Sequence, residues 1–382
     1  MLASTFPARP GDGTPGFVRD LARVEATDFD TVVLVPRLRG AARSEVVDGL
    51  QVERFAYFPR RWEDLADGAI IENLSARPSR LLQVPFFVLF ETLAVRRWVR
   101  RHRPDVLHVH WVVPQGVAAL LAARKVPWLV TTLGGDVYAL NDPVSLRLKR
   151  AVLTRAKAVT TMNRDMRDRL VALGADAGHT LVLPMGADVD GVRRGGAGVT
   201  RIPARLLFVG RLVEKKGLAV LLDALRDLPG GWSLDVAGDG PLRADLERQA
   251  SGLPVTFLGQ TTKDDLARLY ATCEILVAPS VPAASGDQDG LPVALLEAMA
   301  AGCAVVASEI AGIDEAIVDG ESGLLVAPGS KAGLTAALAA LLADPDLRAS
   351  YGAAASARAQ EYSVEALGRR YVALLHEVVR RG

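Results

Sequence analysis

Short apolar runs alternate with amphipathic stretches along nearly the whole chain, and this pattern restricts the fold most. In the first half the runs are rich in β-branched residues and cover Thr31–Val35, Val106–Val109, Trp128–Thr132 and Ala158–Thr161. The second half repeats them at Leu206–Val209, Leu234–Ala237, Val255–Leu258, Ile275–Ala278, Ala304–Ala307 and Gly323–Val326, with amphipathic segments at Leu218–Leu228, Leu242–Ala250 and Leu291–Ala301. Apolar strands that alternate with helices form parallel sheets covered on both faces. The pattern predicts an α/β chain of two doubly wound, Rossmann-like domains.

The length of 382 residues agrees with two domains, since a typical domain has roughly 150 residues. The most glycine-rich stretch runs from Gly191 to Gly198, and a strand restarts soon after it. We therefore expect an N-terminal domain over 1–190, a linker over 191–204 and a C-terminal domain over 205–362. The last helix, 363–382, is expected to pack back on the N-terminal domain.

Composition excludes several classes of protein. The chain has 45 Lys and Arg against 44 Asp and Glu, so it is not a uniformly basic nucleic-acid binder. Its two cysteines form no disulfide framework and favour a reducing cytoplasm. The most lipid-like segment, Leu81–Val95, is interrupted by Gln83, Pro85 and Glu91. It falls short of a clean span of about 18 apolar residues, and we expect a buried helix there.

The segment Phe208–Leu218 indicates a strand end, a tight turn with cations and a helix start. A helix N-terminus already favours anions, and Arg211 and Lys216 could clamp a diphosphate through a planar fork and a point charge. The alternative is a solvated loop with ordinary surface cations.

Two acidic residues stand eight apart in the segment from Ala278 to Gly302. Gly290 and Pro292 indicate that a helix starts between Asp289 and Glu297, which leaves Asp289 in the loop at its mouth. Glu297 then lies inside an apolar helix, where a carboxylate needs a hydroxyl or cationic partner. The alternative is that Glu297 faces solvent.

Two glycine-rich loops carry weaker signals. Gly11–Val18 contains Gly13 and Gly16 and could approach a phosphate or a sugar closely. Gly238–Pro241 follows a strand, and an ordinary strand-to-helix turn explains it. Neither loop gives GxGxxG after a full strand, which disfavours a dinucleotide-dependent oxidoreductase.

Taken together, these segments resemble the retaining glycosyltransferase family 4, the group 1 glycosyltransferases with the GT-B fold. The second-half signature comprises Phe208–Gly217, Val236–Pro241, Phe257–Gly259, Asp289–Ala301 and Gly320–Pro328. The first half adds Ser4–Pro7, His108–Trp111 with Pro114–Gly116, and Gly134–Tyr138. The resemblance covers nearly the whole chain.

The resemblance implies two domains facing a central cleft, with a nucleotide-sugar donor held mainly by the second. Arg211 and Lys216 would bind the donor diphosphate and stabilise the leaving charge. Asp289 would lie near the transferred sugar and Glu297 would bind the ribose hydroxyls. Contacts to the donor are expected from Gly210, from the Gly290 and Leu291 amides, and from Gly13 or Gly16.

The chain departs from the family pattern in three places. Asp289 stands where the family usually has Glu, and Leu133 stands where many relatives have His before Gly-Gly-Asp. We expect His110 to be the nearest substitute on the acceptor side, together with Asp136; the alternative for His110 is an ordinary core histidine. Only Met1–Ala3 precede the Ser4–Pro7 segment, where relatives have a full first strand.

No essential metal and no cofactor are expected. The Asp-x-Asp pairs Asp188/Asp190 and Asp287/Asp289 arise easily by chance. The sequence offers no clear catalytic triad or paired-carboxylate nucleophile. The resemblance implies front-face transfer, in which the departing phosphate helps to deprotonate the acceptor hydroxyl.

A basic patch, Arg96, Arg97, Arg100 and Arg101, follows the lipid-like segment. It could meet an anionic membrane that carries a lipid-linked acceptor. The alternative is that these cations complete the last helical turn, where the helix dipole favours them.

The predicted protein is a cytoplasmic retaining glycosyltransferase acting on a glycan or lipid-linked acceptor, peripheral at the inner membrane face if the patch binds lipid, with no nucleic-acid partner. A GT-B nucleotide-sugar epimerase and a non-catalytic carbohydrate- or nucleotide-binding partner remain alternatives. The near-neutral charge is a cancellation. Residues 1–200 hold 28 basic and 21 acidic residues, a net charge of +7, and residues 201–382 hold 17 and 23, a net charge of −6.

Overall fold

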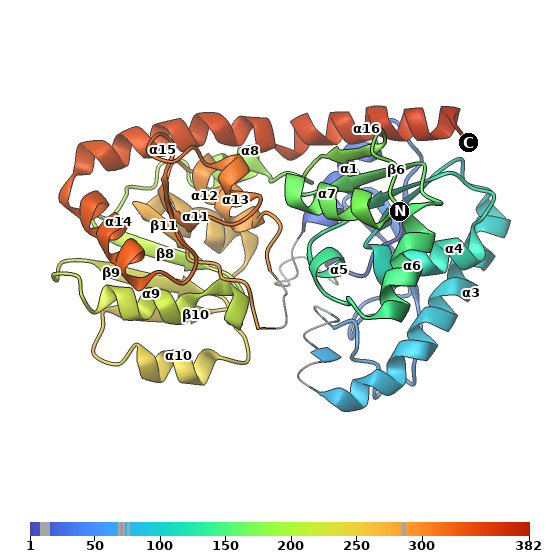
Figure 1. The fold of residues 1–382 in the computed structure, drawn as a ribbon, viewed down its shortest axis with the longest axis horizontal. Coiled ribbons are helices and arrows are strands. Elements are labelled where there is room, and N and C mark those ends of the chain that lie inside the picture. The colour runs from blue at the N-terminus through green and yellow to red at the C-terminus, as the bar shows by residue number, and fades with distance from the viewer. Residues whose placement is uncertain (8–15, 68–69, 71–72, 75–76, 285–287) are drawn as a thin grey trace. The chain divides into compact units, whose positions relative to one another are not determined.

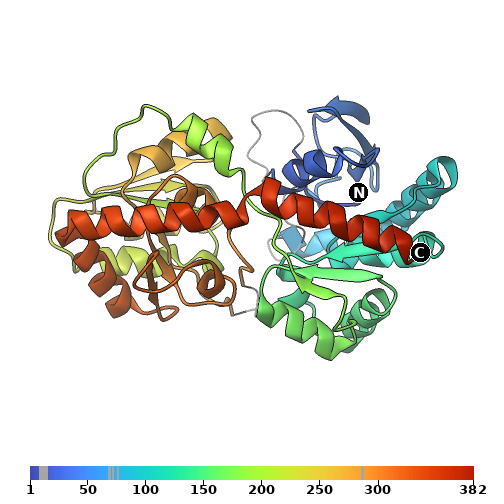
Figure 2. The same cartoon turned by 90° about the horizontal axis from the view of Figure 1, so that it is seen from above.

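The computed structural model describes residues 1–7, 16–67, 70, 73–74, 77–284 and 288–382. The chain divides into two compact units (Figures 1 and 2). Unit 1 comprises Met1–Met185 and Leu367–Gly382, and unit 2 comprises Gly186–Ala366. Each unit is a parallel or mostly parallel sheet with helices packed on it. The chain has the predicted α/β architecture of two Rossmann-like units.

Residues 191–204, expected as a linker, instead belong to unit 2, and helix α8 (Val189–Gly195) begins before them. The Asp188 carboxylate caps this helix by accepting a hydrogen bond from the Gly191 amide at 2.8 Å. A side-chain carbon at Gly195 or Gly196 would lie 2.7 Å from an alanine methyl of the neighbouring helix α11 (Lys263–Thr272). The glycines therefore allow close helix packing rather than a flexible connection.

The sheet of unit 2 contains all six strands predicted for the second half. They are β8 (Arg205–Val209), β9 (Ser233–Ala237), β10 (Val255–Gly259), β11 (Ile275–Ala278), β12 (Ala304–Ser308) and β13 (Leu324–Val326). The order is β10-β9-β8-β11-β12-β13, and every pairing is parallel. The chain moves outward in opposite directions from β8 and β11, so the topological switch point lies between these two strands.

Helices cover both faces of this sheet and bury its apolar side chains (Figure 1). One core lies under α9 (Leu218–Leu225), α10 (Arg243–Gln249) and α14 (Lys331–Ala343). The other core lies under α8 and α11, together with α12 (Val293–Ala300), α13 (Ile313–Ala316) and α15 (Pro345–Ala359). Coverage on both faces explains why the strands β8, β11 and β12 are largely apolar runs in the sequence.

Unit 1 contains the four strands predicted for the first half and three that the sequence analysis missed. The predicted ones are β1 (Val32–Pro36), β4 (Leu107–His110), β5 (Trp128–Thr131) and β6 (Ala158–Thr161); the others are β2 (Ser44–Val47), β3 (Leu50–Phe55) and β7 (Thr180–Val182). β3 pairs in parallel with β1, whereas β2 pairs antiparallel with β3. The polar, partly exposed hairpin of β2 and β3 lacks the continuous apolar run of a central strand.

The first residues occupy the position of a central strand in unit 1. Leu2 forms bridges to Leu34 of β1 and to Val109 of β4. The Leu2 amide donates to the His108 carbonyl at 2.8 Å, and the His110 amide donates to the Leu2 carbonyl at 2.9 Å. These few residues join β3-β1 to the parallel order β4-β5-β6-β7.

Further helices in the described part of unit 1 flank these strands. They are α1 (Phe17–Glu25), α3 (Val84–His102), α4 (Val117–Ala122), α5 (Gly135–Tyr138), α6 (Pro143–Leu153) and α7 (Arg164–Leu173), with the short turns η1 (Pro78–Gln83) and η2 (Val112–Gly116). The last helix, α16 (Val364–Arg380), reaches unit 1 from Leu367 onward. Its Tyr371 hydroxyl donates to the Leu183 carbonyl at 2.6 Å.

Helix α3 is not the buried helix that the sequence led us to expect. Phe87, Glu91 and Val95 are buried, but Phe86 and Leu93 are exposed, and Leu82 in the preceding turn η1 is 72% exposed. By length and composition the run Pro78–His102 could cross a membrane, with 22% of its most apolar window buried. In the structure it packs one face against unit 1 and leaves an apolar face open.

Candidate functional site

The predicted donor residues gather at the carboxyl ends of β8 and β11, at the switch point of unit 2. Gly210 directly follows β8, and Ser280 lies two residues after β11. In open α/β sheets, ligands bind in the crevice outside the carboxyl ends of the strands at this point. The topology alone therefore selects this edge of unit 2 as a binding site.

Glycines let the backbone segments approach closely at this edge. A side-chain carbon at Gly217, whose φ is +68°, would lie 1.8 Å from the Pro279 carbonyl oxygen. One at Gly238, with φ at +141°, would lie 1.9 Å from the Gly210 carbonyl oxygen. Such a carbon does not fit at either position, so both positions require glycine. The Gly238 turn, which looked ordinary in the sequence, therefore packs directly against the strand end of the site.

An ion pair joins the two sequence motifs that lie 73 residues apart. Lys216, at the end of the 3₁₀ turn η3 (Glu214–Lys216), directs its Nζ to Asp289 Oδ2 at 2.8 Å. Both side chains are largely buried, with 19% and 11% of their surface exposed. The aliphatic stem of Lys216 packs across Gly210, with Cδ and Cε 3.4 Å from the place of a side-chain carbon. The charges are thus held by packing as well as by attraction.

Asp289 is ionised at neutral pH in this arrangement. Burial alone would raise the pKa of the Asp289 carboxyl, but Lys216 and Lys215 hold the pKa below its usual value. The Ser280 hydroxyl also donates to Asp289 Oδ2, at 3.0 Å. A cation and an anion therefore face each other where a charged ligand would enter.

Backbone contacts fix the loops that carry these residues. The Val281 amide donates to the Lys215 carbonyl at 2.8 Å, and the Ala284 amide donates to Glu214 Oε1 at 3.1 Å. Arg211 follows Gly210 and is partly buried. The turn after β8 and the loop after β11 thus form one connected structure.

Glu297 has the hydroxyl partner that its position in an apolar helix required. It lies on α12, where Leu296 and Ala298 are buried, and its Oε2 accepts a hydrogen bond from the Tyr270 hydroxyl at 2.9 Å. Burial and this carboxylate raise the pKa of Tyr270 well above its usual range. The tyrosine therefore remains a hydrogen-bond donor and orients the carboxylate.

The other predicted donor contacts are placed only in part. Gly290 is buried and Leu291 is partly buried in the loop that leads into α12. Gly16 stands at the N-terminus of α1 in unit 1, with Asp20 in the first turn. Gly13 and Asp287 lie outside the described residues. Donor contact by any of these residues stays a prediction.

His110 is a core histidine in the structure and not an open acceptor-side group. It is fully buried at the end of β4, and its ring stacks on His108 with the centroids 4.2 Å apart. Burial holds the pKa of His110 well below its usual range, so the ring is neutral. It presents no surface to an acceptor in this structure, because the surrounding strands enclose it.

Asp136 is likewise buried and occupied by backbone. Its Oδ2 accepts from the Val112 amide at 2.9 Å, and its Oδ1 accepts from the Leu133 amide at 3.0 Å and the Gly134 amide at 3.2 Å. Burial raises the pKa of Asp136, although these amides oppose the shift. The carboxylate thus organises the turn that contains Leu133 instead of facing solvent.

Sequence reasoning missed Tyr270 and Ser280. The sequence predicted that Glu297 needs a polar partner. It does not identify that partner as Tyr270, because this tyrosine lies on another helix. Within the part of the chain that the structure describes, no group of three or more His, Cys, Asp or Glu side chains is arranged to hold a metal ion.

Comparison with known families and proteins identifies the family of the chain. Residues 203–344 match the family described as glycosyl transferases group 1, and residues 13–186 match the glycosyl transferase 4-like domain. The phosphatidyl-myo-inositol mannosyltransferase of Mycobacterium leprae is 32% identical over 302 residues, which cover 75% of this chain and 77% of the relative. The amylovoran biosynthesis glycosyltransferase AmsK of Erwinia amylovora is 35% identical, over 46% of this chain and 45% of its own length.

Solved structures share the fold across almost the whole chain. The sucrose-phosphate synthase of Thermosynechococcus elongatus superposes with a TM-score of 0.79 at 21% identity, covering 100% of this chain and 98% of that one. Anabaena HepE in complex with UDP-glucose gives a TM-score of 0.70 at 19% identity, covering 98% of each chain. These likenesses establish the GT-B fold.

The close approach at Gly217 yields a prediction about stability. Gly217→Ala should lower the free energy of unfolding by about 1–3 kcal/mol more than Gly252→Ala. Of these two glycines, Gly217 faces a backbone carbonyl and Gly252 does not. Gly252 is the matched control, since its φ of +80° imposes a similar left-handed strain and nothing lies within 4 Å of the added carbon. Denaturant unfolding measures both. Equal losses in the two variants would contradict the packing described here.

Proposed function

Because this chain belongs to the group 1 glycosyltransferases, we propose that it transfers a sugar from a nucleotide-diphosphate donor to a glycan or lipid-linked acceptor. The single observation that carries the proposal is the Lys216–Asp289 pair at the switch point of unit 2. The UDP-glucose complex of the structurally similar HepE supports a nucleotide-sugar donor.

The donor diphosphate lies over the turn from Gly210 to Lys216 in this proposal. Arg211 and Lys216 face the phosphates, and their charge stabilises the negative charge that develops as the glycosidic bond to phosphate breaks. In the structure the Lys216 ammonium is paired with Asp289. The diphosphate attracts the ammonium, which frees the Asp289 carboxylate to accept hydrogen bonds from hydroxyls of the transferred sugar.

Glu297 binds the ribose hydroxyls of the donor. The Tyr270 hydroxyl, 2.9 Å from Oε2, fixes the carboxylate orientation before the donor arrives. A carboxylate held in one orientation loses less conformational freedom on binding, which favours affinity. The Gly290 and Leu291 amides complete the donor contacts at the loop before α12.

We further propose retention of configuration without an essential metal. The acceptor oxygen attacks from the face that the phosphate leaves, and an oxygen of the departing phosphate takes the proton of the acceptor hydroxyl. The new bond is then on the same face as the old one. Arg211 and Lys216 supply the positive charge at the leaving group.

The exposed face of α3 and the preceding turn η1 supports a membrane-bound acceptor. Along this face an apolar section is followed by a basic one. The apolar section comprises Leu81, Leu82, Phe86, Leu89, Phe90 and Leu93, all exposed, and the basic section comprises Arg96, Arg97, Arg100 and Arg101, also exposed. Helices of this kind lie in the interface of anionic bilayers, with apolar side chains inserted and cations at the headgroups.

We therefore place the enzyme at the cytoplasmic face of an anionic membrane, where α3 docks and a lipid-linked acceptor is available. The helix face changes from apolar to basic along its length, which fits the apolar interior and the anionic headgroups of a membrane. A second copy of the chain would have to offer a surface that complements four arginines. The two-cysteine composition favours a reducing compartment.

The donor assignment predicts the effect of a single charge removal. Lys216→Ala should reduce kcat/KM for the donor by at least about 30-fold, or roughly 2 kcal/mol of transition-state stabilisation. Lys331→Ala is the control, because Lys331 pairs with Asp227 at the same 2.8 Å but in an exposed position outside the site. A panel of UDP-, GDP- and ADP-sugars, screened by thermal shift, identifies the donor for the assay. Near-normal turnover of the Lys216 variant would refute the site.

The stereochemical proposal is tested on the product. Proton NMR of the purified glycoside should show the anomeric configuration of the donor, and excess EDTA should leave the initial rate within about twofold. Inversion, or a rate abolished by EDTA and restored by a divalent cation, would contradict the proposed mechanism. Formation of an epimerised donor without any added acceptor would support the epimerase alternative instead.

Membrane docking is tested by sedimentation with vesicles. Leu82→Ser/Leu89→Ser/Leu93→Ser should reduce binding to phosphatidylglycerol-containing vesicles by at least about tenfold, because the inserted apolar area is lost. The control is Val144→Ser/Leu148→Ser, which removes exposed apolar side chains from α6. Replacing the four arginines of α3 by Ala should remove the preference for anionic over neutral vesicles. Wild-type binding by both α3 variants would exclude docking through this helix.

A further inference from the structure

A small basic cavity opens at the strand ends of unit 1, far along the sequence from the donor motifs. Its volume is about 190 Å³, and the loop that leaves β1 and the loop that leaves β3 form its walls. The lining residues are Arg37, Leu38, Arg39, Ala41, Arg43, Arg60 and Glu63. Four of the seven are arginines, and one is acidic.

The single carboxylate is already used by the wall of the cavity. Glu63 Oε2 pairs with Arg37 Nε at 2.5 Å, and Glu63 Oε1 accepts from the Tyr57 amide at 2.7 Å and the Phe58 amide at 3.3 Å. The Glu63 side chain is 3% exposed. This buried carboxylate therefore fixes the Arg37 guanidinium and has no remaining role for the other arginines.

Arg39, Arg43 and Arg60 have no such partner. Among the residues that the structure describes, no carboxylate oxygen lies within 4 Å of any of the three. The Arg39 side chain donates only to the Arg61 carbonyl, at 3.4 Å. The neighbouring Asp64 attracts Arg39 at longer range, but it is bound by Arg80 at 2.8 Å, and this bond is the main reason that the pKa of Asp64 is lowered. Arg39, Arg43 and Arg60 are exposed, and the two neighbouring carboxylates are each bound by another arginine. The excess of positive charge at the cavity therefore favours an anion.

The cavity also lies at the functional edge of the sheet. β1 and β3 run parallel and end in register, with Pro36 opposite Phe55. Arg37 follows β1 directly, and its amide donates to the Phe55 carbonyl at 2.8 Å. Both loops therefore leave the carboxyl edge, where ligands of open α/β sheets bind.

We propose that this arginine cavity binds a phosphate or diphosphate group of the acceptor, which rests on the proposed transferase function. Guanidinium groups match phosphate oxygens through paired hydrogen bonds. Whole small-molecule ligands usually occupy about 300–1,000 Å³, so a cavity of this volume fits one charged group of a larger molecule. The acceptor is thus a phosphate-bearing glycoside, either lipid-linked or water-soluble.

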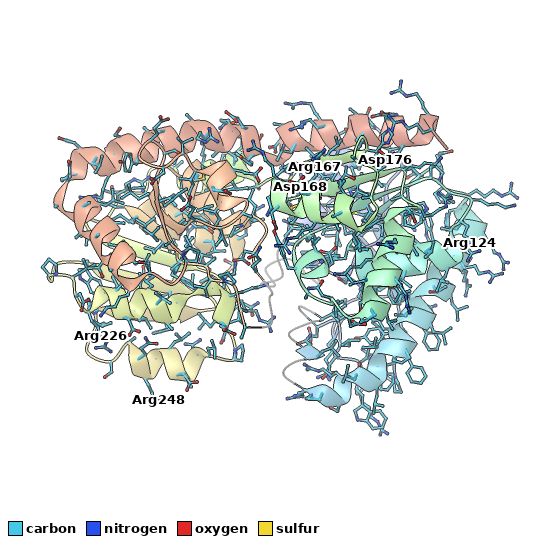
Figure 3. All side chains as sticks on the ribbon, viewed as in Figure 1. Arg124, Arg167, Asp168, Asp176, Arg226 and Arg248 are labelled. Carbon is cyan, nitrogen blue, oxygen red and sulfur yellow. The ribbon has the colours of Figure 1, made fainter. Side chains whose placement is uncertain are left out.

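The test measures binding of inorganic pyrophosphate and of a nucleoside diphosphate by isothermal titration calorimetry at constant ionic strength. Arg39→Ala/Arg60→Ala should bind pyrophosphate at the cavity at least tenfold more weakly and the nucleoside diphosphate as the wild type does. The same titration is repeated in protein that also carries Lys216→Ala, which removes pyrophosphate binding at the donor site. The pyrophosphate binding that remains then reports on the cavity alone. The control is Arg124→Ala/Arg147→Ala, which removes two exposed arginines of unit 1, one of them labelled in Figure 3.

Pyrophosphate binding that is equal in the cavity double variant and the control would overturn the proposal and leave the donor site intact. The proposed function is tested separately by the single variant Lys216→Ala, which should lose nucleoside-diphosphate binding. If the double variant is unstable by circular dichroism, Arg60→Gln alone should still weaken binding at least threefold. Competition with pyrophosphate by farnesyl phosphate would indicate a lipid-linked acceptor, and competition by a sugar 1-phosphate would indicate a water-soluble one. If neither compound competes, the assignment is contradicted.

Discussion

The ion pair between Lys216 and Asp289 joins the two halves of the candidate donor site. It connects the turn after β8 with the loop before α12, at the single point where the strand order of unit 2 reverses. The close approach of Gly217 to the Pro279 carbonyl makes this geometry possible. Because both charges are largely removed from water, each one is stabilised by the other, and removal of either would leave a buried charge without its partner.

Much of unit 2 could be predicted from the sequence, because most of its strands are buried and largely apolar. All six strands follow from that pattern, and Gly290 and Pro292 indicate that α12 starts between Asp289 and Glu297. The role of residues 191–204 could not be predicted, since glycine is used there for close packing against α11 as readily as it is in a linker. Tyr270, which meets Glu297 from another helix, depends on a tertiary contact that no local pattern encodes.

Fewer elements of unit 1 could be predicted from the sequence. The hairpin β2–β3 is polar and partly exposed, so it lacks the apolar run of a central strand. Helix α3 has apolar side chains on its exposed face as well as on its buried face, and the sequence does not distinguish the two. His110 has the residue type of a catalytic group, but strand β4 places it in the core. Arginines cluster at the end of α3 and around the arginine cavity, the two places where we propose contact with a membrane and with a phosphate of the acceptor.

The central claim is that the Lys216 ammonium binds the donor diphosphate at the carboxyl edge of β8. A crystal structure of the protein with its nucleotide-diphosphate sugar tests this most directly. We expect Lys216 Nζ within hydrogen-bond distance of a phosphate oxygen, the Asp289 contact lengthened beyond its present 2.8 Å, and the Glu297 carboxylate on the ribose. A diphosphate bound elsewhere, with the Lys216–Asp289 pair intact, would contradict the account.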